Sequence, residues 1–273
     1  MKVVIHMKSL SRMKNREGDI SESVRALRRE DLKDIYKLMM RCPTEEKYRL
    51  AAEHCWYLIA FLCMMRIDEL RDCLEWKDIE FLPGQTKTMT IHLRRRKNDQ
   101  LNKRETKFEL ERNNNPGEEY LCPIRALLRY VQIVRKCVYD CEPAGPDGAR
   151  PVKLYLTGPF MRAVDDKGYL LSRPPSYNHF LKRFRFNMSR IGRPGHLYGL
   201  HSFRRGGAQY YTQFISGKKW SLTKLCDWGG WSRQTLQSIA RYITGALDGP
   251  SVMGSFFRGN NNLTLEKMQE SSE

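Results

Sequence analysis

An uninterrupted apolar run from Cys55 to Met65 is the feature of this sequence that most restricts its fold. These eleven residues are too few to cross a bilayer, which takes about 20, so the run predicts a helix buried in a protein core. Pro43 and the acidic pair Glu45 and Glu46 precede it, and both residue types favour the first turn of a helix. We therefore expect a central core helix that begins near Pro43, and no membrane-spanning segment.

Two further patterns set the fold class. Apolar residues at Leu32, Ile35 and Met39 have the spacing of an amphipathic helix. Apolar and polar residues alternate over 89–93 and again over 106–110, which predicts a β-hairpin with a basic tip. Helices are also expected from 122 onward and at about 176–189, 203–215, 221–227 and 232–243. The predicted fold is mainly α with a small antiparallel β-sheet, an α+β class.

The sequence indicates one domain with two tails. It contains no internal repeat and no obvious linker, so we expect a single domain over residues 25–250. Residues 1–24 form an N-terminal tail or linker, and 251–273 form a C-terminal tail. The first 20 residues lack the apolar segment and the cleavage site of a secretory signal. The protein is expected to be intracellular.

Composition indicates the class of partner. The chain carries 48 Lys and Arg against 31 Asp and Glu, a formal net charge of +17. A surplus of this size indicates a polyanionic partner. Eight cysteines are scattered without a CxxC pair, which is typical of buried reduced thiols rather than of disulfides or zinc sites. We expect no metal and no small-molecule cofactor.

Two basic features stand out against this background. Arg66 closes the apolar run, where a core helix would be expected to avoid a charge. A purely structural interpretation is that Arg66 is a helix-end arginine whose charged head reaches solvent. The run Arg94–Lys97 lies at the predicted hairpin turn. A basic run of this kind usually indicates a solvated turn or a nuclear import signal.

Two features later in the sequence also have a purely structural interpretation. His201 and Arg204 are three residues apart at the start of a predicted helix, and therefore lie on one face. A lone histidine in such a place is more often structural. Trp228 and Trp231 precede a predicted helix that ends near Tyr242, and a tyrosine there is ordinarily an interface aromatic.

Taken together and in this order, these residues resemble the tyrosine recombinases, also called phage-type integrases. The family's first arginine box is similar to the segment that contains Arg66, Glu69, Leu70, Leu74, Trp76, Asp78 and Ile79. The hairpin lysine of the family matches Lys97, its His-x-x-Arg box matches His201 and Arg204, its histidine-or-tryptophan position matches Trp231, and its nucleophile matches Tyr242. The resemblance runs from about residue 25 to 245, so the expected domain is a tyrosine recombinase catalytic domain.

The resemblance implies a site-specific exchange of DNA strands through a 3′-phosphotyrosine bond to Tyr242, without metal or ATP. Arg66 and Arg204 would give charge-assisted hydrogen bonds to the phosphate oxygens on which charge builds up. His201 would take the proton of the tyrosine, and Lys97 would give a proton to the leaving 5′-oxygen.

The same resemblance assigns supporting roles. Trp231 would donate its indole N–H to a phosphate oxygen, and Glu69 would pair with an arginine to fix its rotamer. The expected DNA contacts are Arg94, Arg95, Arg96 and Arg205. The partner is double-stranded DNA, on which four protomers would assemble in the synapse, with the C-terminal tail docking on a neighbour. The segment HSFRRGGA around His201 is most similar to recombinases of eukaryotic Crypton and DIRS-type mobile elements. This similarity implies a nuclear location in a eukaryotic host.

The sequence departs from the family pattern at three points. Trp231 and Tyr242 are slightly farther apart than is usual, so Trp228 stays open as an alternative for that position. Met65 stands before Arg66 where the family usually has glycine, which predicts a tighter turn. The family's N-terminal core-binding domain has no counterpart in the first 24 residues, so this sequence is expected to be a fragment or a shortened derivative.

Two other functions share part of this signal. Type IB topoisomerases use arginine, lysine, histidine and tyrosine in a similar way, but one protomer must encircle a duplex and this chain is short for that. A domesticated DNA-binding protein would keep the fold without the chemistry, although the candidate catalytic positions here all hold chemically competent residues. A covalent protein–DNA adduct would separate the enzymes from the binding protein.

The net charge of +17 generates a prediction about salt. A protein that makes about six to ten phosphate contacts loses about 10³- to 10⁵-fold in affinity between about 50 and 200 mM salt, because neutralised phosphates release counterions. We expect duplex binding by this protein, titrated over that range, to weaken by a factor of this order. A flat response to salt would mean that the charge serves another purpose.

Overall fold

The computed structural model describes residues 24–81, 87–94, 96, 106–141, 157–164, 170–213 and 220–231. Its long helices are α2 (Arg29–Arg41), α3 (Thr44–Leu62), α4 (Pro123–Cys141), α5 (Tyr177–Arg190), α6 (Ser202–Gln213) and α7 (Leu222–Gly229). Short turns of π- or 3-10 type are η1 (Glu69–Cys73), η2 (Trp76–Asp78), η3 (Glu119–Leu121) and η5 (Gly195–Leu197). The predicted helix at 232–243 and both predicted tails, apart from residue 24, lie outside the described residues.

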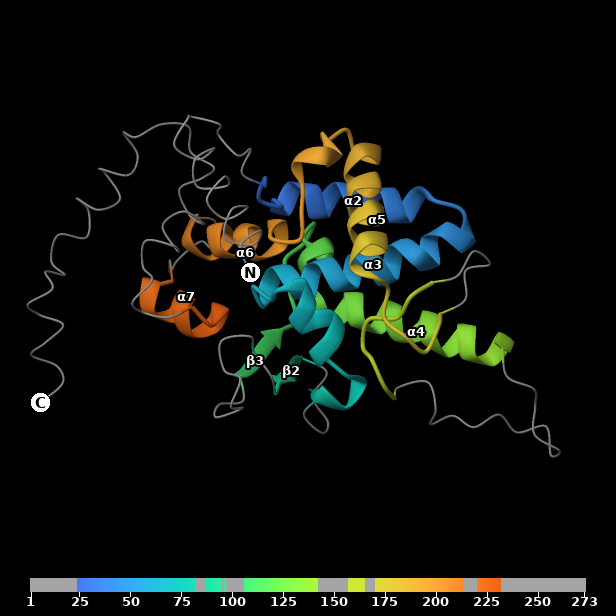
Figure 1. Ribbon diagram of the computed structural model, residues 1–273, viewed down its shortest axis with the longest axis horizontal. Helices are drawn as coiled ribbons and strands as arrows, with labels where there is room; N and C mark the ends of the chain where they lie inside the picture. The colour runs from blue at the N-terminus through green and yellow to red at the C-terminus, as the bar shows by residue number, and fades with distance from the viewer. Residues whose placement is uncertain are drawn as a thin grey trace, which may run out of the picture.

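Helix α3 forms the centre of the molecule, with α2, α4 and α6 packed around it (Figure 1). Every residue from Leu50 to Leu62 is buried, as expected for a helix that is enclosed on all sides. The predicted core helix is confirmed, and Pro43 lies just before its first turn as the N-cap residue. None of the described helices is long and apolar enough to cross a membrane.

A small antiparallel sheet lies beside the helices, with its strands in the order β1 (Ile79–Phe81), β2 (Thr88–Leu93) and β3 (Thr106–Glu111). Alternate side chains of β2 and β3 are buried, which confirms the predicted hairpin. Strand β1 was not predicted, because three residues are too few to display a period of two. The fold is mainly α with a small antiparallel sheet, as predicted.

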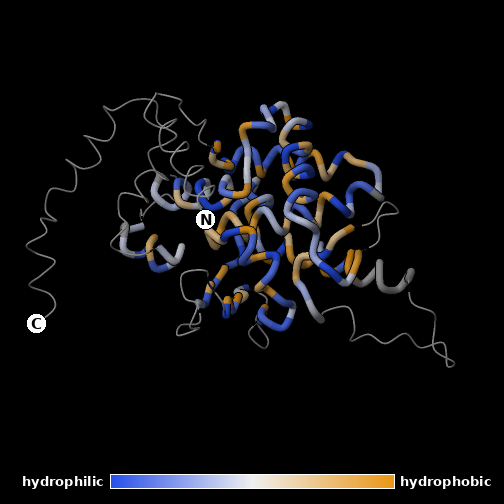
Figure 2. The backbone as a smooth tube through the Cα atoms, viewed as in Figure 1, coloured by the Kyte–Doolittle hydropathy of each residue, from blue (hydrophilic) through white to orange (hydrophobic). Residues whose placement is uncertain are grey.

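Aromatic side chains fill the spaces between α3 and its neighbours. The ring of Tyr57 on α3 lies 5.1 Å from that of Phe184 on α5 and 5.3 Å from that of Phe203 on α6, measured between centroids. Apolar and polar stretches alternate along the helices in Figure 2, as expected for elements with one buried face. The large rings therefore join three helices into one core.

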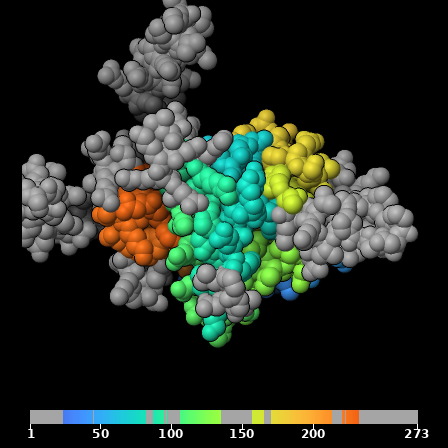
Figure 3. Space-filling model, turned by 90° about the horizontal axis from the view of Figure 1, so that it is seen from below, coloured from blue at the N-terminus to red at the C-terminus, as the bar shows by residue number. Residues whose placement is uncertain are grey.

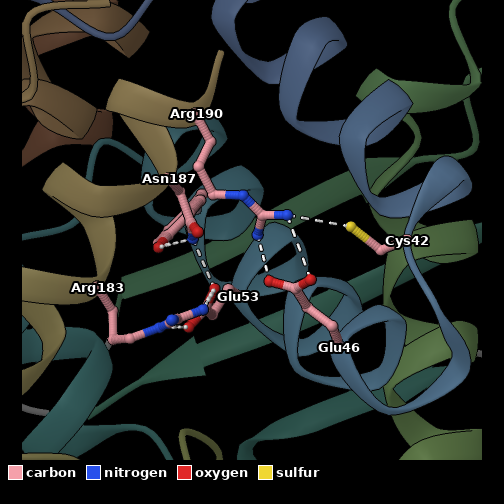
Figure 4. A network of polar contacts seen from close by, with 7 residues as sticks. Cys42, Glu46, Glu53, Arg183, Asn187 and Arg190 are labelled. Atoms are coloured by element: carbon pink, nitrogen blue, oxygen red, sulfur yellow. Dashed lines mark hydrogen bonds and ion pairs between the residues drawn. The ribbon is translucent and has the colours of Figure 1, made fainter.

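A polar network fastens α5 to α3 (Figure 4). The carboxylate of Glu53 is buried within α3, and it accepts hydrogen bonds from Arg183 Nε at 2.9 Å and from Asn187 Nδ2 at 2.6 Å. Farther along α5, Arg190 pairs with Glu46 and donates to Cys42 Sγ at 3.3 Å. A buried carboxylate is tolerated when it is paired in this way, so the network orients α5 without a cost for an isolated charge.

Two adjacent glycines let α6 approach its neighbours closely. A Cβ atom on Gly207 would lie 2.0 Å from the carbonyl oxygen of Phe61, and one on Gly206 would lie 1.9 Å from that of Leu27. Real Cβ atoms do not approach backbone this closely, so any larger residue would push α6 away from α3. Gly207 therefore sets the distance between α6 and α3 next to the candidate site, and Gly206 sets the distance between α6 and the segment that precedes α2.

Six cysteines whose side chains the structure describes are free thiols, namely Cys42, Cys55, Cys63, Cys73, Cys122 and Cys226. Four of the six are buried, and burial raises the pKa of the Cys55 and Cys63 thiols well above its usual range. A thiol with a raised pKa is a poor nucleophile, so these residues act as core side chains.

We expect Gly207→Ala and Gly206→Ala each to lower the free energy of unfolding by about 1–3 kcal/mol through overpacking. The loss would occur although alanine favours a helix over glycine by about 1 kcal/mol. Urea denaturation measures the change. Gly199→Ala is the control, since the atoms nearest to its Cβ would belong to the side chain of Val24, at 3.2 Å, and not to the backbone. An unchanged or raised stability of the Gly207 variant would contradict the close approach.

Candidate active site

The turn after α3 leads to the first candidate, Arg66. Helix α3 ends because Met64 takes a left-handed conformation with φ of 48°, which is uncommon for a residue other than glycine. The N–H groups of Met65 and Met64 then donate to the carbonyls of Ala60 and Phe61, the two hydrogen bonds of a Schellman motif. A glycine-like turn therefore does precede Arg66, with Met64 in the left-handed position.

Glu69 holds the side chain of Arg66. Its carboxylate accepts the backbone N–H of Arg66 at 2.9 Å and Nη1 of the same residue at 3.2 Å. The Glu69 side chain is only 3% exposed, and that of Arg66 is 19% exposed. The pair is thus largely shielded from water, and the guanidinium is oriented while part of it stays accessible.

Arg204 is buried in the first turn of α6, with 1% of its surface exposed. Its Nη1 donates to the carbonyl of Met64 at 2.8 Å, and its guanidinium carbon lies 4.0 Å from the centre of the Trp231 ring. A carbonyl and an aromatic face both stabilise a desolvated cation. Arg204 therefore connects the turn before Arg66 with the turn that follows α7.

Helix α7 ends in a second Schellman motif. Gly230 is left-handed with φ of 64°, and its N–H donates to the carbonyl of Asp227. The N–H of Trp231 donates to the carbonyl of Cys226 at 2.9 Å. These are the two hydrogen bonds of the motif, and they fix the backbone of Trp231 relative to α7.

The two tryptophans near this turn have different surroundings. The indole N–H of Trp228 donates to the carbonyl of Leu62 at 2.9 Å, and its ring packs edge-on against Phe108 at 5.1 Å. The ring of Trp231 lies on the guanidinium of Arg204. Of the two candidates for the histidine-or-tryptophan position, it is thus Trp231 that lies beside the arginine, while Trp228 joins the sheet to α3.

The hairpin arginines differ in burial. Arg94 is 57% exposed, with Nε 2.9 Å from the carboxylate of Asp78. Arg96 is 9% exposed, and its Nη2 donates to the carbonyl of Trp228 at 2.8 Å. The guanidinium of Arg96 is turned inward against α7, whereas Arg94 lies on the surface, and the predicted DNA contact of Arg96 stays a prediction.

The residues next to Arg204 point outward or toward the N-terminal segment. His201 is exposed directly before α6. Arg205 is half-buried, and its Nη1 donates to the carbonyl of Val24. His201 and Arg204 therefore share one helical turn, with the histidine at the surface and the arginine below it.

Three predicted residues, Arg95, Lys97 and Tyr242, lie outside the described residues. Tyr210 and Tyr211 on α6 are the tyrosines that would compete for the role of nucleophile. Burial raises the pKa of both phenols, and the Tyr211 hydroxyl donates to a backbone carbonyl at 3.0 Å. A phenol must lose its proton to attack phosphorus, so neither is suited to the task.

Positive charge gathers where these segments meet. Burial lowers the pKa of Arg96, while the charge of Glu69 acts to raise it and that of Arg66 acts to lower it. Arg96 is therefore within electrostatic reach of the Arg66–Glu69 pair and also contacts α7. Together with Arg204, three guanidinium groups lie near the ends of α3 and α7. A cluster of this kind favours an anion as its ligand.

Sequence reasoning missed the backbone groups of the site. The carbonyls of Met64 and Trp228 each accept a hydrogen bond from a buried arginine. The Gly229–Gly230 pair before Trp231 is a signal for a helix end of this kind, whereas no residue type marks the turn at Met64. Over the described ranges, no three His, Cys, Asp or Glu side chains gather closely enough to hold a metal ion.

No protein-family model and no curated protein sequence matches the chain. Among solved structures it is similar to the XerH site-specific recombinase bound to difH substrate in a pre-cleavage complex, with a TM-score of 0.46 and 16% identity over 82% of this chain and 52% of that chain. The post-cleavage complex of XerH with palindromic difH gives a TM-score of 0.41 and 15% identity over 80% and 53%. The chain spans about half the length of these recombinase chains.

The buried Arg66–Glu69 pair generates a prediction about stability. We expect Glu69→Gln to lower the free energy of unfolding by about 1–3 kcal/mol, because a charged donor loses its charged acceptor. Thermal or urea denaturation measures the change. In the control Glu30→Gln the partner is Arg29, and both side chains are well exposed, so a change within about 0.5 kcal/mol is expected. Equal effects of the two substitutions would mean that the buried Arg66–Glu69 pair contributes no more to stability than an exposed ion pair.

Proposed function

We propose that this protein is a site-specific DNA recombinase of the tyrosine type, which cleaves and rejoins double-stranded DNA through a 3′-phosphotyrosine. The observation that supports this most is the meeting of three distant segments. Arg204 donates to the carbonyl of Met64, two residues before Arg66, and lies 4.0 Å from the ring of Trp231. Two guanidinium groups and an indole N–H form a donor set that suits one phosphodiester.

In the proposed cleavage step, Arg66 and Arg204 hold the non-bridging oxygens of the phosphate as negative charge increases on them. The phenol oxygen of Tyr242 attacks phosphorus and gives its proton to His201. The bond from phosphorus to the 5′-oxygen breaks, and Lys97 gives that oxygen a proton. The products are a 3′-phosphotyrosine and a free 5′-hydroxyl.

Rejoining reverses these transfers. The 5′-hydroxyl of an incoming strand attacks the phosphotyrosine and its proton returns to Lys97. Tyr242 leaves as a phenolate, which His201 protonates to the phenol. One phosphodiester is present before and after each step, so the bond energy is kept and no ATP is required. The strand exchange between two duplexes uses four active sites, so the proposed assembly on DNA is a tetramer.

Surface features support DNA as the partner. His201 is exposed beside the buried Arg204, and Arg94 is exposed on the hairpin. The net charge of +17 favours a polyanion of duplex size. The sequence HSFRRGGA around His201 supports a more specific proposal, that the protein originates from a eukaryotic mobile element.

A nicked suicide duplex, in which the cleaved end diffuses away, tests the proposal. We expect the wild-type chain to form an adduct that survives a denaturing gel, and the labelled peptide to contain Tyr242. Tyr242→Phe should bind the duplex normally and form no adduct, because the phenol oxygen is the nucleophile. Tyr210→Phe is the control and should form the adduct. An adduct that maps to another tyrosine would refute the assignment.

The same experiment separates the alternatives. Tight duplex binding by the wild-type chain without any adduct would favour a non-catalytic DNA-binding protein. An adduct accompanied by relaxation of supercoiled DNA, with no exchange between two duplexes, would favour a type IB topoisomerase.

A further inference from the structure

Arg96 occupies an unusual place for a residue in a basic hairpin run. It follows β2, yet it is 9% exposed and contacts two other elements. Its Nη2 donates to the Trp228 carbonyl at 2.8 Å, and its guanidinium carbon lies 5.2 Å from the centre of the Phe108 ring on β3. Figure 3 shows α7, in orange, directly beside the green surface of the hairpin strands. Arg96 is thus a bridge between the sheet and α7.

The bridge completes the C-terminus of α7. The last turn of a helix leaves carbonyls without intrahelical partners. The Schellman motif satisfies those of Cys226 and Asp227, and Arg96 satisfies that of Trp228. A cation is also favoured at a helix C-terminus, because the helix dipole is negative there. Arg96 therefore acts as a cap that another part of the chain supplies.

Gly230 shows how closely the cap fits. A Cβ atom at this position would lie 1.9 Å from Arg96 Nη1. Glycine is thus required twice, once for the left-handed φ of 64° and once for the guanidinium that lies over it. The next residue is Trp231, whose ring lies on Arg204. A continuous set of contacts therefore runs from the hairpin through Arg96 and Gly230 to Trp231 and Arg204.

We propose that Arg96 is a positioning residue, which locks the turn after α7 and so holds Trp231 on Arg204 while the hairpin is engaged with DNA. In this role Arg96 contacts neither the scissile phosphate nor a groove of the DNA. Phe108 supports it from below, because its ring contacts both the guanidinium of Arg96 and the ring of Trp228. The catalytic part of this inference rests on the proposed function, whereas the locking of the turn does not.

Three measurements on the full chain test this role. The first is hydrogen exchange of the amides of Gly230 and Trp231 in the free protein, the second is the Kd for a duplex, and the third is the rate of adduct formation on saturating suicide duplex. The variants are Arg96→Met, which removes the donor but keeps an apolar stem, and Arg96→Lys, which keeps a charge. Lys107→Met removes an exposed cation from the same hairpin and is the control.

In Arg96→Met we expect exchange of the two amides to accelerate by about tenfold or more, as when a hydrogen bond from a charged donor is lost. The Kd should stay within about twofold of wild type, since a buried residue makes no phosphate contact to lose. The adduct rate at saturation should fall by about 10- to 100-fold, because a small displacement of a catalytic group costs that much. Arg96→Lys should lie between wild type and Arg96→Met, and Lys107→Met should leave exchange and adduct rate unchanged.

Two results would overturn the proposal. Unchanged exchange at Gly230 and Trp231 in Arg96→Met would show that the turn does not depend on Arg96. A Kd that weakens in step with the adduct rate would make Arg96 a DNA contact. If Arg96→Met does not fold by circular dichroism, the same criteria apply to Arg96→Lys. If the wild-type chain forms no adduct, the proposed function fails, and the exchange of the free protein still decides whether Arg96 locks the turn.

Discussion

The hydrogen bond from Arg204 to the carbonyl of Met64 is the interaction on which the rest of the site depends. It requires α6 to lie almost in contact with the end of α3, which Gly206 and Gly207 permit. It also requires a carbonyl that is turned out of its helix, which the left-handed Met64 provides. A guanidinium that is 1% exposed is stable only where such partners are fixed in advance. Close packing of backbones thus comes first, and the placement of charge follows from it.

Two helices end in the same way at this place, and each end delivers a candidate functional residue. The motif at Met64 leads into Arg66, and the motif at Gly230 leads directly into Trp231. A Schellman turn fixes its backbone by two hydrogen bonds, so the residues that leave it have a defined direction. Donors that are oriented before a ligand arrives need little reorganisation when it binds, which is how preorganised sites lower a barrier.

Sequence patterns predicted the elements better than the contacts between them. The alternation through Met89, Ile91 and Leu93 marked the hairpin, because burial of one sheet face imposes a period of two. Arg96 could not be placed in this way, since a cation in a basic run is expected at the surface. Its inward position depends on the Trp228 carbonyl and the Phe108 ring, which belong to distant segments. The resemblance implied that Glu69 would pair with an arginine, but no pattern showed that Met64 would turn the chain.

The arrangement places cations in buried positions. Burial is the largest cause of the lowered pKa of Arg96, and the charge of Glu69 acts to raise that pKa more than the charge of Arg66 acts to lower it. Glu69 thus offsets the repulsion between the two arginines, while the cost of burying Arg96 remains. Evolution toward stability alone would replace one arginine by an apolar residue, because buried ionic groups are seldom the most stable choice. Their presence is understandable if an anion completes the site, since a ligand that binds only the folded state adds its own binding free energy to stability. In the proposed reaction that anion is the scissile phosphate, which pairs with Arg66 and Arg204 when DNA is bound.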